Sequence, residues 1–182
     1  VYMRSLATRG SKSELPAVIR DAIAVVKAAG FDIIFVETAG IGQGDTEVVD
    51  ISDICLYVMT TEYGAPTQLE KIDMIDFADI IVLNKFDRKG SEDALRDISR
   101  QVRRSRNLLD ASVEELPVYG TMASKFNDEG VNGLYAGLIE LIGQKFSRQF
   151  PCNIPGERIS PVSPVRYIIP PERIRYLGEI TE

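Results

Sequence analysis

Short apolar runs that alternate with helical patterns constrain the fold of this chain most strongly. The clearest is Ile80-Ile81-Val82-Leu83, because four consecutive apolar residues are typical of a strand buried on both faces of a parallel sheet. Strands are expected at residues 1–4, 32–37, 54–59, 79–84 and 116–119, and helices at 13–29, 67–76, 91–106 and 131–147. This alternation predicts an α/β fold with a mainly parallel sheet and helices on both faces. Ligands bind such sheets beyond the carboxyl ends of the strands.

The run at 80–83 leads into Asn84-Lys85-Phe86-Asp87, and this Asn-Lys-x-Asp loop favours a guanine site. Guanine presents two donors on one edge, N1–H and the 2-amino group, and one ionised carboxylate accepts both. Adenine offers neither donor there, so we expect Asp87 to select the base. The Lys85 stem is expected along the ring face, and Asn84 is expected to tie the loop to its neighbours. The alternative is a polar strand-to-helix turn with a helix cap.

A second motif follows the predicted strand at 32–37. Glu37 comes directly after the apolar residues, and Gly40, Gly42 and Gly44 follow it. In phosphate-hydrolysing sites an acid in this place holds Mg²⁺, usually through water, and a glycine lets a backbone N–H approach the terminal phosphate. We therefore expect Glu37 to serve the metal and Gly40 to contact the nucleotide, in a loop that the phosphate orders. A glycine-rich loop without a ligand is the alternative.

A third segment, residues 120–125, follows the predicted strand at 116–119. It contains Thr121 and Ala123, and a backbone N–H near Ala123 can bond guanine O6, an acceptor that Asp87 cannot serve. Turn chemistry alone explains this segment equally well. The prediction is that Thr121 and Ala123 join the base site.

Charge and composition exclude several classes of function. The net charge of −6 and pI near 4.9 disfavour nucleic-acid binding, for which a basic face is expected. No apolar stretch approaches the about 18 residues of a membrane span, and we expect no signal peptide. Cys55 and Cys152 favour a reducing, cytoplasmic setting. Histidine is absent, which excludes Ser-His-Asp and Cys-His catalysis but leaves phosphoryl transfer open.

One element of a nucleotide site is missing from the chain. No Gly-x-x-x-x-Gly-Lys-[Ser/Thr] occurs, the loop whose amides and lysine hold the β- and γ-phosphates. We therefore expect an incomplete P-loop NTPase-type fold whose phosphate loop precedes Val1 in a longer polypeptide. Residues 1–148 are expected to form this partial G-protein domain. Six prolines between positions 151 and 171 predict that residues 149–182 form an extended linker.

Longer stretches around these motifs resemble one protein family. The stretches are Val1–Arg9, Glu37–Gln43, Val58–Ala65, Gln68–Met74, Asn84–Asp87 and Pro170–Leu177. They are similar to the GTPase chaperones of cobalamin-dependent acyl-CoA mutases, which include the G-protein domain of fused isobutyryl-CoA mutases and the separate metallochaperones of methylmalonyl-CoA mutase. Some of the latter carry the label lysine/arginine/ornithine transport ATPase. The last stretch is similar to the linker that enters the substrate-binding part of the mutase.

The resemblance implies a GTPase that binds GTP or GDP with Mg²⁺ and gates the loading of adenosylcobalamin onto an acyl-CoA mutase of the isobutyryl-CoA type. It implies that Glu37 takes the acidic metal position, that Gln43 orients water, and that residues 38–45 and 60–71 are switches. The implied partners are mutase domains, in the same polypeptide or another chain, within a homodimeric parent. The cobalamin-binding signature needs a histidine, so adenosylcobalamin is not expected to bind this chain. Without its phosphate loop the chain alone is expected to be inactive.

Two other functions stay open at this point. A non-catalytic module with a GTPase-like fold can dock onto a mutase without hydrolysing nucleotide. A transport-linked ATPase is the second alternative, and Asp87 argues against it through its choice of base.

Overall fold

The computed structural model describes residues 1–7, 15–16, 18–38, 47–62, 69, 72–108, 110–112 and 115–164. Its centre is a parallel sheet in the order β1 (Leu56–Met59), β2 (Ile80–Asn84) and β3 (Val118–Thr121). In register, Leu56 pairs with Ile80 and Asn84 pairs with Thr121. These are the strands predicted at 54–59, 79–84 and 116–119. Because they are parallel, their polar carboxyl ends lie at one edge of the sheet.

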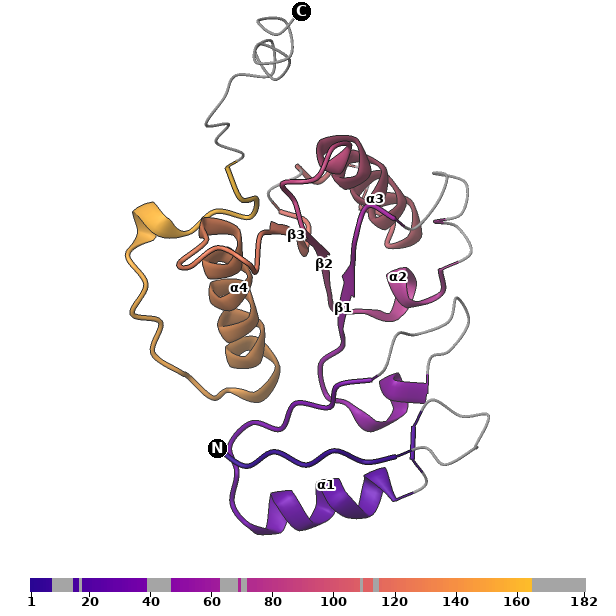
Figure 1. Cartoon of the computed structure of the whole chain (residues 1–182), viewed down its shortest axis with the longest axis vertical. Coiled ribbons are helices and arrows are strands. Elements are labelled where there is room, and N and C mark those ends of the chain that lie inside the picture. The colour runs from indigo at the N-terminus through magenta and orange to yellow at the C-terminus, as the bar shows by residue number, and fades with distance from the viewer. Residues whose placement is uncertain are drawn as a thin grey trace, which may run out of the picture.

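Helices lie on both sides of this sheet (Figure 1). α4 (Glu129–Phe146) covers one side, while α3 (Ser91–Ser105) and the short α2 (Met74–Phe77) cover the other. The side towards α2 and α3 contains the hydrophobic core, whose most deeply buried members are Ile75, Ile81, Leu83, Ile98 and Val102. The predicted α/β class, with a parallel sheet and helices on both faces, is therefore confirmed.

α4 approaches β3 through a stripe of glycines at Gly130, Gly133 and Gly137, which we call the glycine stripe. These positions share one face of the helix because they are three and four residues apart. A Cβ at Gly130 would overlap the carbonyl oxygen of Gly120, and a Cβ at Gly137 would overlap the Tyr119 hydroxyl. Burial beneath the helix, and then the charge of Glu140, raise the pKa of that Tyr119 hydroxyl. Gly130 thus lets the backbones of α4 and β3 pack directly, Gly133 leaves room for the Ser160 carbonyl, and Gly137 leaves room for the Tyr119 side chain.

Residues 160–164, which we call the docked segment, lie beside β3. The Gly120 N–H donates to Pro161 O at 2.9 Å, and the Ser163 N–H donates to Gly120 O at 2.8 Å, which forms a parallel bridge between Gly120 and Val162. A short 3₁₀ turn, η3 (Gly156–Arg158), precedes the segment. This part of the proline-rich region therefore pairs with the sheet.

Two predicted strands, at residues 1–4 and 32–37, are wrong. Both runs are extended, but neither pairs with another described strand. Phe35 is 82% exposed and Ile33 is 41% exposed, whereas Ile34 and Val36 are half-buried. An apolar run becomes a strand only where a neighbouring backbone takes its N–H and C=O groups. These runs find no such neighbour among the described residues.

Two further predicted helices lie partly outside the described residues. The helix expected at 13–29 corresponds to α1 (Ile19–Ala28), which buries no residue, and residues 13–14 and 17 are outside the described part. The helix expected at 67–76 overlaps α2 at its end, and residues 67–68 and 70–71 are outside the described part. Another 3₁₀ turn, η1 (Glu47–Ile51), precedes β1. No helix in the described part of the chain has the length and apolar character needed to cross a membrane.

Candidate nucleotide-binding site

Two loops at the carboxyl edge of the sheet are tied together by one side chain, Asn84. We call residues 84–87 the base loop and residues 121–125 the second loop. Asn84 Oδ1 accepts from Thr121 Oγ1 and from the Ala123 N–H, both at 3.2 Å. The Phe86 N–H donates to Thr121 O at 3.0 Å. The structure therefore brings Asn84, Thr121 and Ala123 together, as their positions after neighbouring strands predict.

Asp87 and Lys85 lie on the exposed side of the base loop. Asp87 makes no hydrogen bond or ion pair with another described residue, so its carboxylate oxygens are available to a ligand. Lys85 has a φ of 58°, a left-handed conformation that costs a non-glycine residue about 1–2 kcal/mol. Such strain persists where surrounding contacts impose it, and it is concentrated at functional sites.

Phe86 anchors the base loop from below. Its side chain is only 3% exposed and belongs to the hydrophobic core. A Cβ at Gly120 would lie 2.8 Å from the Phe86 ring, so the ring lies directly against the β3 backbone. Burial of Phe86 fixes Lys85 and Asp87 on either side of it in a polar, solvent-facing position.

The amide available to a base differs from the one that the sequence suggests. The Ala123 N–H already donates to Asn84, and the Lys125 N–H donates to Met122 O at 2.8 Å. The Ser124 N–H, between them, donates to no residue in the described part of the chain. Ala123 thus holds the second loop in place, and Ser124 supplies its free donor. Sequence reasoning missed Ser124 because only the turn geometry separates neighbouring amides.

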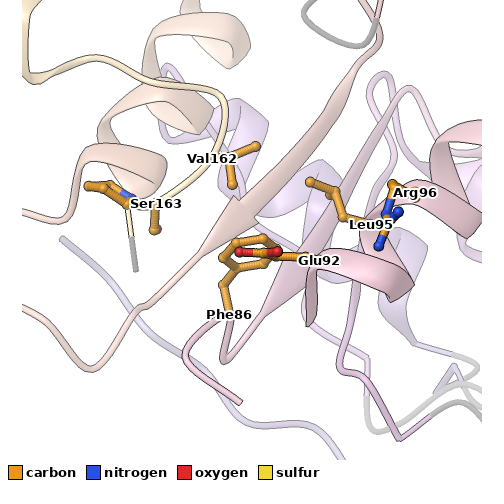
Figure 2. A pocket seen from close by; sticks show the side chains of 7 residues that line it. Phe86, Glu92, Leu95, Arg96, Val162 and Ser163 are labelled. Carbon is orange, nitrogen blue, oxygen red and sulfur yellow. The ribbon is translucent and has the colours of Figure 1, made fainter. Parts of the chain in front are cut away.

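A solvent-open depression of about 420 Å³ lies behind the base loop (Figure 2). It is lined by Phe86, Glu92, Leu95, Arg96, Val162, Ser163 and Pro164. Figure 2 shows the Phe86 ring between α3 and the docked segment. Neither Asp87 nor Lys85 lines the depression, which is therefore distinct from the proposed base site and brings the docked segment close to the base loop.

Of the predicted metal and hydrolysis residues, Glu37 lies within the described part of the chain. Glu37 is exposed on the segment 31–38, in which Asp32 forms an ion pair with Arg148, two residues beyond the end of α4. Gly40 and Gln43 lie outside the described residues. Among the described residues no three acidic or sulfur ligands cluster as a metal site. Mg²⁺ in nucleotide sites keeps several waters and uses one or two carboxylates plus phosphates, so a single exposed carboxylate fits that requirement.

An ion pair links the base loop region to the beginning of the predicted switch at 60–71. Arg88 donates to Glu62, whose other oxygen lies 3.4 Å from Thr60 Oγ1. Both charged side chains are largely exposed, and such pairs contribute about 0–1 kcal/mol. The pair gives a contact between the two regions but adds little stability.

A protein-family model described as methylmalonyl Co-A mutase-associated GTPase MeaB matches residues 1–143. This match covers the base loop, the second loop and the segment with Glu37.

Similar full-length proteins include fused isobutyryl-CoA mutases. The chain is 56% identical over 182 residues to the one from Geobacillus kaustophilus and 51% identical over 184 residues to the one from Cupriavidus metallidurans. In both cases the whole chain is covered but only 17% of the relative. A protein of Pyrococcus abyssi that is named as a GTPase is 41% identical over 92 residues, which cover 50% of the chain and 28% of that protein.

Proposed function

The chain belongs to the MeaB family of methylmalonyl-CoA mutase-associated GTPases, and on this premise we propose that it binds and hydrolyses GTP as the chaperone domain of an acyl-CoA mutase. The parent mutase is proposed to be of the isobutyryl-CoA type, because the fused mutases align with the entire chain. GTP hydrolysis in this domain gates the loading of adenosylcobalamin onto the mutase part. Adenosylcobalamin itself binds elsewhere in the parent protein.

The observation that carries this proposal is the Asn84 junction. It holds two loops at the carboxyl edge of the sheet and leaves the Asp87 carboxylate and the Ser124 N–H without partners among the described residues. An acceptor for the N1–H and 2-amino edge and a donor for O6 are the complementary groups that guanine needs. Adenine satisfies neither group.

The roles of the individual residues follow from their chemistry. Asp87 takes the guanine edge, the Lys85 stem covers the ring face, and Asn84, Thr121 and Ala123 hold the two loops. Glu37 serves Mg²⁺, Gly40 contacts the terminal phosphate, and Gln43 orients water. Bound GTP would supply the phosphoryl group, and Mg²⁺ held by Glu37 would neutralise the negative charge on it. Residues 1–148 form the nucleotide-binding part, and residues 149–182 connect it to the mutase.

The partners in this proposal are the mutase domains of the same homodimeric, cytoplasmic parent. The acidic net charge of −6 gives no support for a nucleic-acid partner. A mutase partner is supported by the fused architecture of the relatives, of which the chain spans about a sixth.

Calorimetry of the intact protein with nucleotide and Mg²⁺ tests the proposal. We expect GTP and GDP to bind at least about 100-fold more tightly than ATP and ADP, since a buried or unpaired polar group discriminates strongly between analogues. Absence of any heat with GTP would favour the non-catalytic docking module. Equal heats with GTP and ATP would favour the transport-type ATPase.

Replacement of Glu37 with alanine tests the metal role. We expect Mg²⁺-dependent GTP hydrolysis by the intact protein to fall by about 10–100-fold, the usual cost of losing a group that orients a metal through water. GDP affinity without Mg²⁺ should stay the same. Asp32→Ala is the matched control, since it removes a carboxylate from the same segment and should leave turnover unchanged. Unchanged GTP hydrolysis by the Glu37→Ala protein would show that Glu37 does not serve Mg²⁺.

A further inference from the structure

The docked segment contacts the site through Ser163, which is 1% exposed. Its backbone N–H donates to Gly120 O at 2.8 Å, immediately before the second loop. Its Oγ lies 2.5 Å from Asp128 Oδ2 and 3.0 Å from Gly120 O. The one hydroxyl proton goes to the carboxylate, because a charged acceptor makes the stronger bond. A buried side chain of the docked segment thus bonds directly to Asp128.

One carboxylate oxygen of Asp128 accepts three hydrogen bonds. Besides the Ser163 hydroxyl, Oδ2 accepts from the Met122 N–H at 3.1 Å and from the Val131 N–H at 3.0 Å. The Val131 bond caps α4. Asp128 is 6% exposed, so little water competes for these bonds. Displacement of any one donor changes how the carboxylate holds the other two.

Met122 lies next to the residues that face the base. It is followed by Ala123, whose N–H is fixed on Asn84, and by Ser124, whose N–H is free among the described residues. The Lys125 N–H closes the turn on Met122 O. The position of the Ser124 N–H therefore depends on Asp128, which holds Met122, and on Asn84, which holds Ala123.

We propose that Ser163, acting through Asp128, is a positioning residue for the amide that recognises the 6-oxo group of the purine. The docked segment then belongs to the base site and sets its affinity for 6-oxopurine nucleotides. This inference rests on the proposed function, because it assumes that guanine occupies the site.

Ser163→Ala in the intact protein, with Ser160→Ala as the matched control, tests the inference. Ser160 Oγ donates within the docked segment, to Val162 O at 2.8 Å, and does not reach the second loop. The probes are GDP and 6-thio-GDP, which keeps the N1–H and 2-amino donors but carries a sulfur, a weaker acceptor, in place of O6. Calorimetry gives both affinities, and circular dichroism checks that each variant is folded.

We expect Ser163→Ala to weaken GDP binding by about three- to tenfold, part of the effect of losing a hydrogen bond to a charged group. The affinity of Ser163→Ala for 6-thio-GDP should change by less than about twofold, so that the ratio of GDP affinity to 6-thio-GDP affinity falls. Ser160→Ala should leave both affinities unchanged. Equal losses for both nucleotides indicate general destabilisation and overturn the proposal, as does unchanged GDP binding.

A second variant covers the case in which Ser163→Ala does not fold. Ser163→Cys keeps a weaker donor. The loss of GDP affinity in this variant should be smaller than in Ser163→Ala, and the affinity for 6-thio-GDP should not change. Equal losses of affinity for both nucleotides again overturn the proposal. Failure of the proposed function has a different signature, because the parent protein would then bind GDP no better than ADP.

Discussion

Asp87→Asn in the intact protein is expected to weaken GDP binding by at least about 100-fold and to strengthen binding of xanthosine diphosphate. The amide places a donor where guanine also has donors, whereas xanthine has a carbonyl in place of the 2-amino group. Because Asp87 is exposed and forms no hydrogen bond or ion pair with other described residues, the substitution should leave the fold intact. Calorimetry with the two diphosphates measures both effects.

Asp93→Asn is the matched control for Asp87→Asn. Asp93 is an exposed carboxylate in the first turn of α3, where it pairs with Arg96, and its replacement should leave both nucleotide affinities unchanged. An Asp87→Asn protein that binds GDP as tightly as its parent would show that Asp87 does not select the base. The guanine-specific part of the proposal would then be lost.

Gly133→Ala is expected to lower the free energy of unfolding of this chain by about 1–3 kcal/mol, the usual range for overpacking. The added Cβ would overlap the carbonyl oxygen of Ser160 and lie 2.7 Å from its carbonyl carbon. Both atoms belong to the backbone, so no flexible side chain can move aside. Urea unfolding followed by circular dichroism measures the change.

Gly143→Ala separates packing from helix propensity in the same helix. Its Cβ would find Arg148 O at 3.8 Å, an ordinary contact, and alanine favours a helix over glycine by up to about 1 kcal/mol. We expect this variant to be as stable as the parent or more so. If Gly133→Ala matched it, the glycine stripe would not limit the approach of α4.

The sheet and its main helices could be predicted from the sequence because their signals are local and mutually consistent. The apolar run at 80–83 has the burial of a central strand, and the helical patterns at 91–106 and 131–147 correspond to α3 and α4 within two residues. The order of strand, polar loop and helix also placed Asn84 and Thr121 at one edge. The sequence did not predict which residues of neighbouring strands pair with each other.

The predictions at 1–4 and 32–37 failed because an apolar run does not specify its partner. Ile33 and Phe35 have the residue types of a buried strand, yet both are exposed. Pairing depends on a neighbouring backbone, which the run itself does not encode. The position of Glu37 relative to Asp87 rested on this strand and therefore stays a prediction.

Asp128 and Ser163 were missed for a different reason. They are 35 positions apart, and each is an ordinary polar residue in its local sequence. Asp128 resembles a helix cap, which it is, and Ser163 lies among prolines that predict a linker. Their shared role arises only when α4 and residues 160–164 meet beside Gly120.

The bridge between Gly120 and Val162 also has a consequence for solubility. A strand at the rim of a sheet offers unpaired amides and carbonyls to any other extended chain, and this is a common start of aggregation. Pro161 O and the Ser163 N–H take both groups of Gly120, and a proline within the covering stretch cannot itself donate to a further strand. A polypeptide shortened before Ser160 would leave that rim open and prone to self-association.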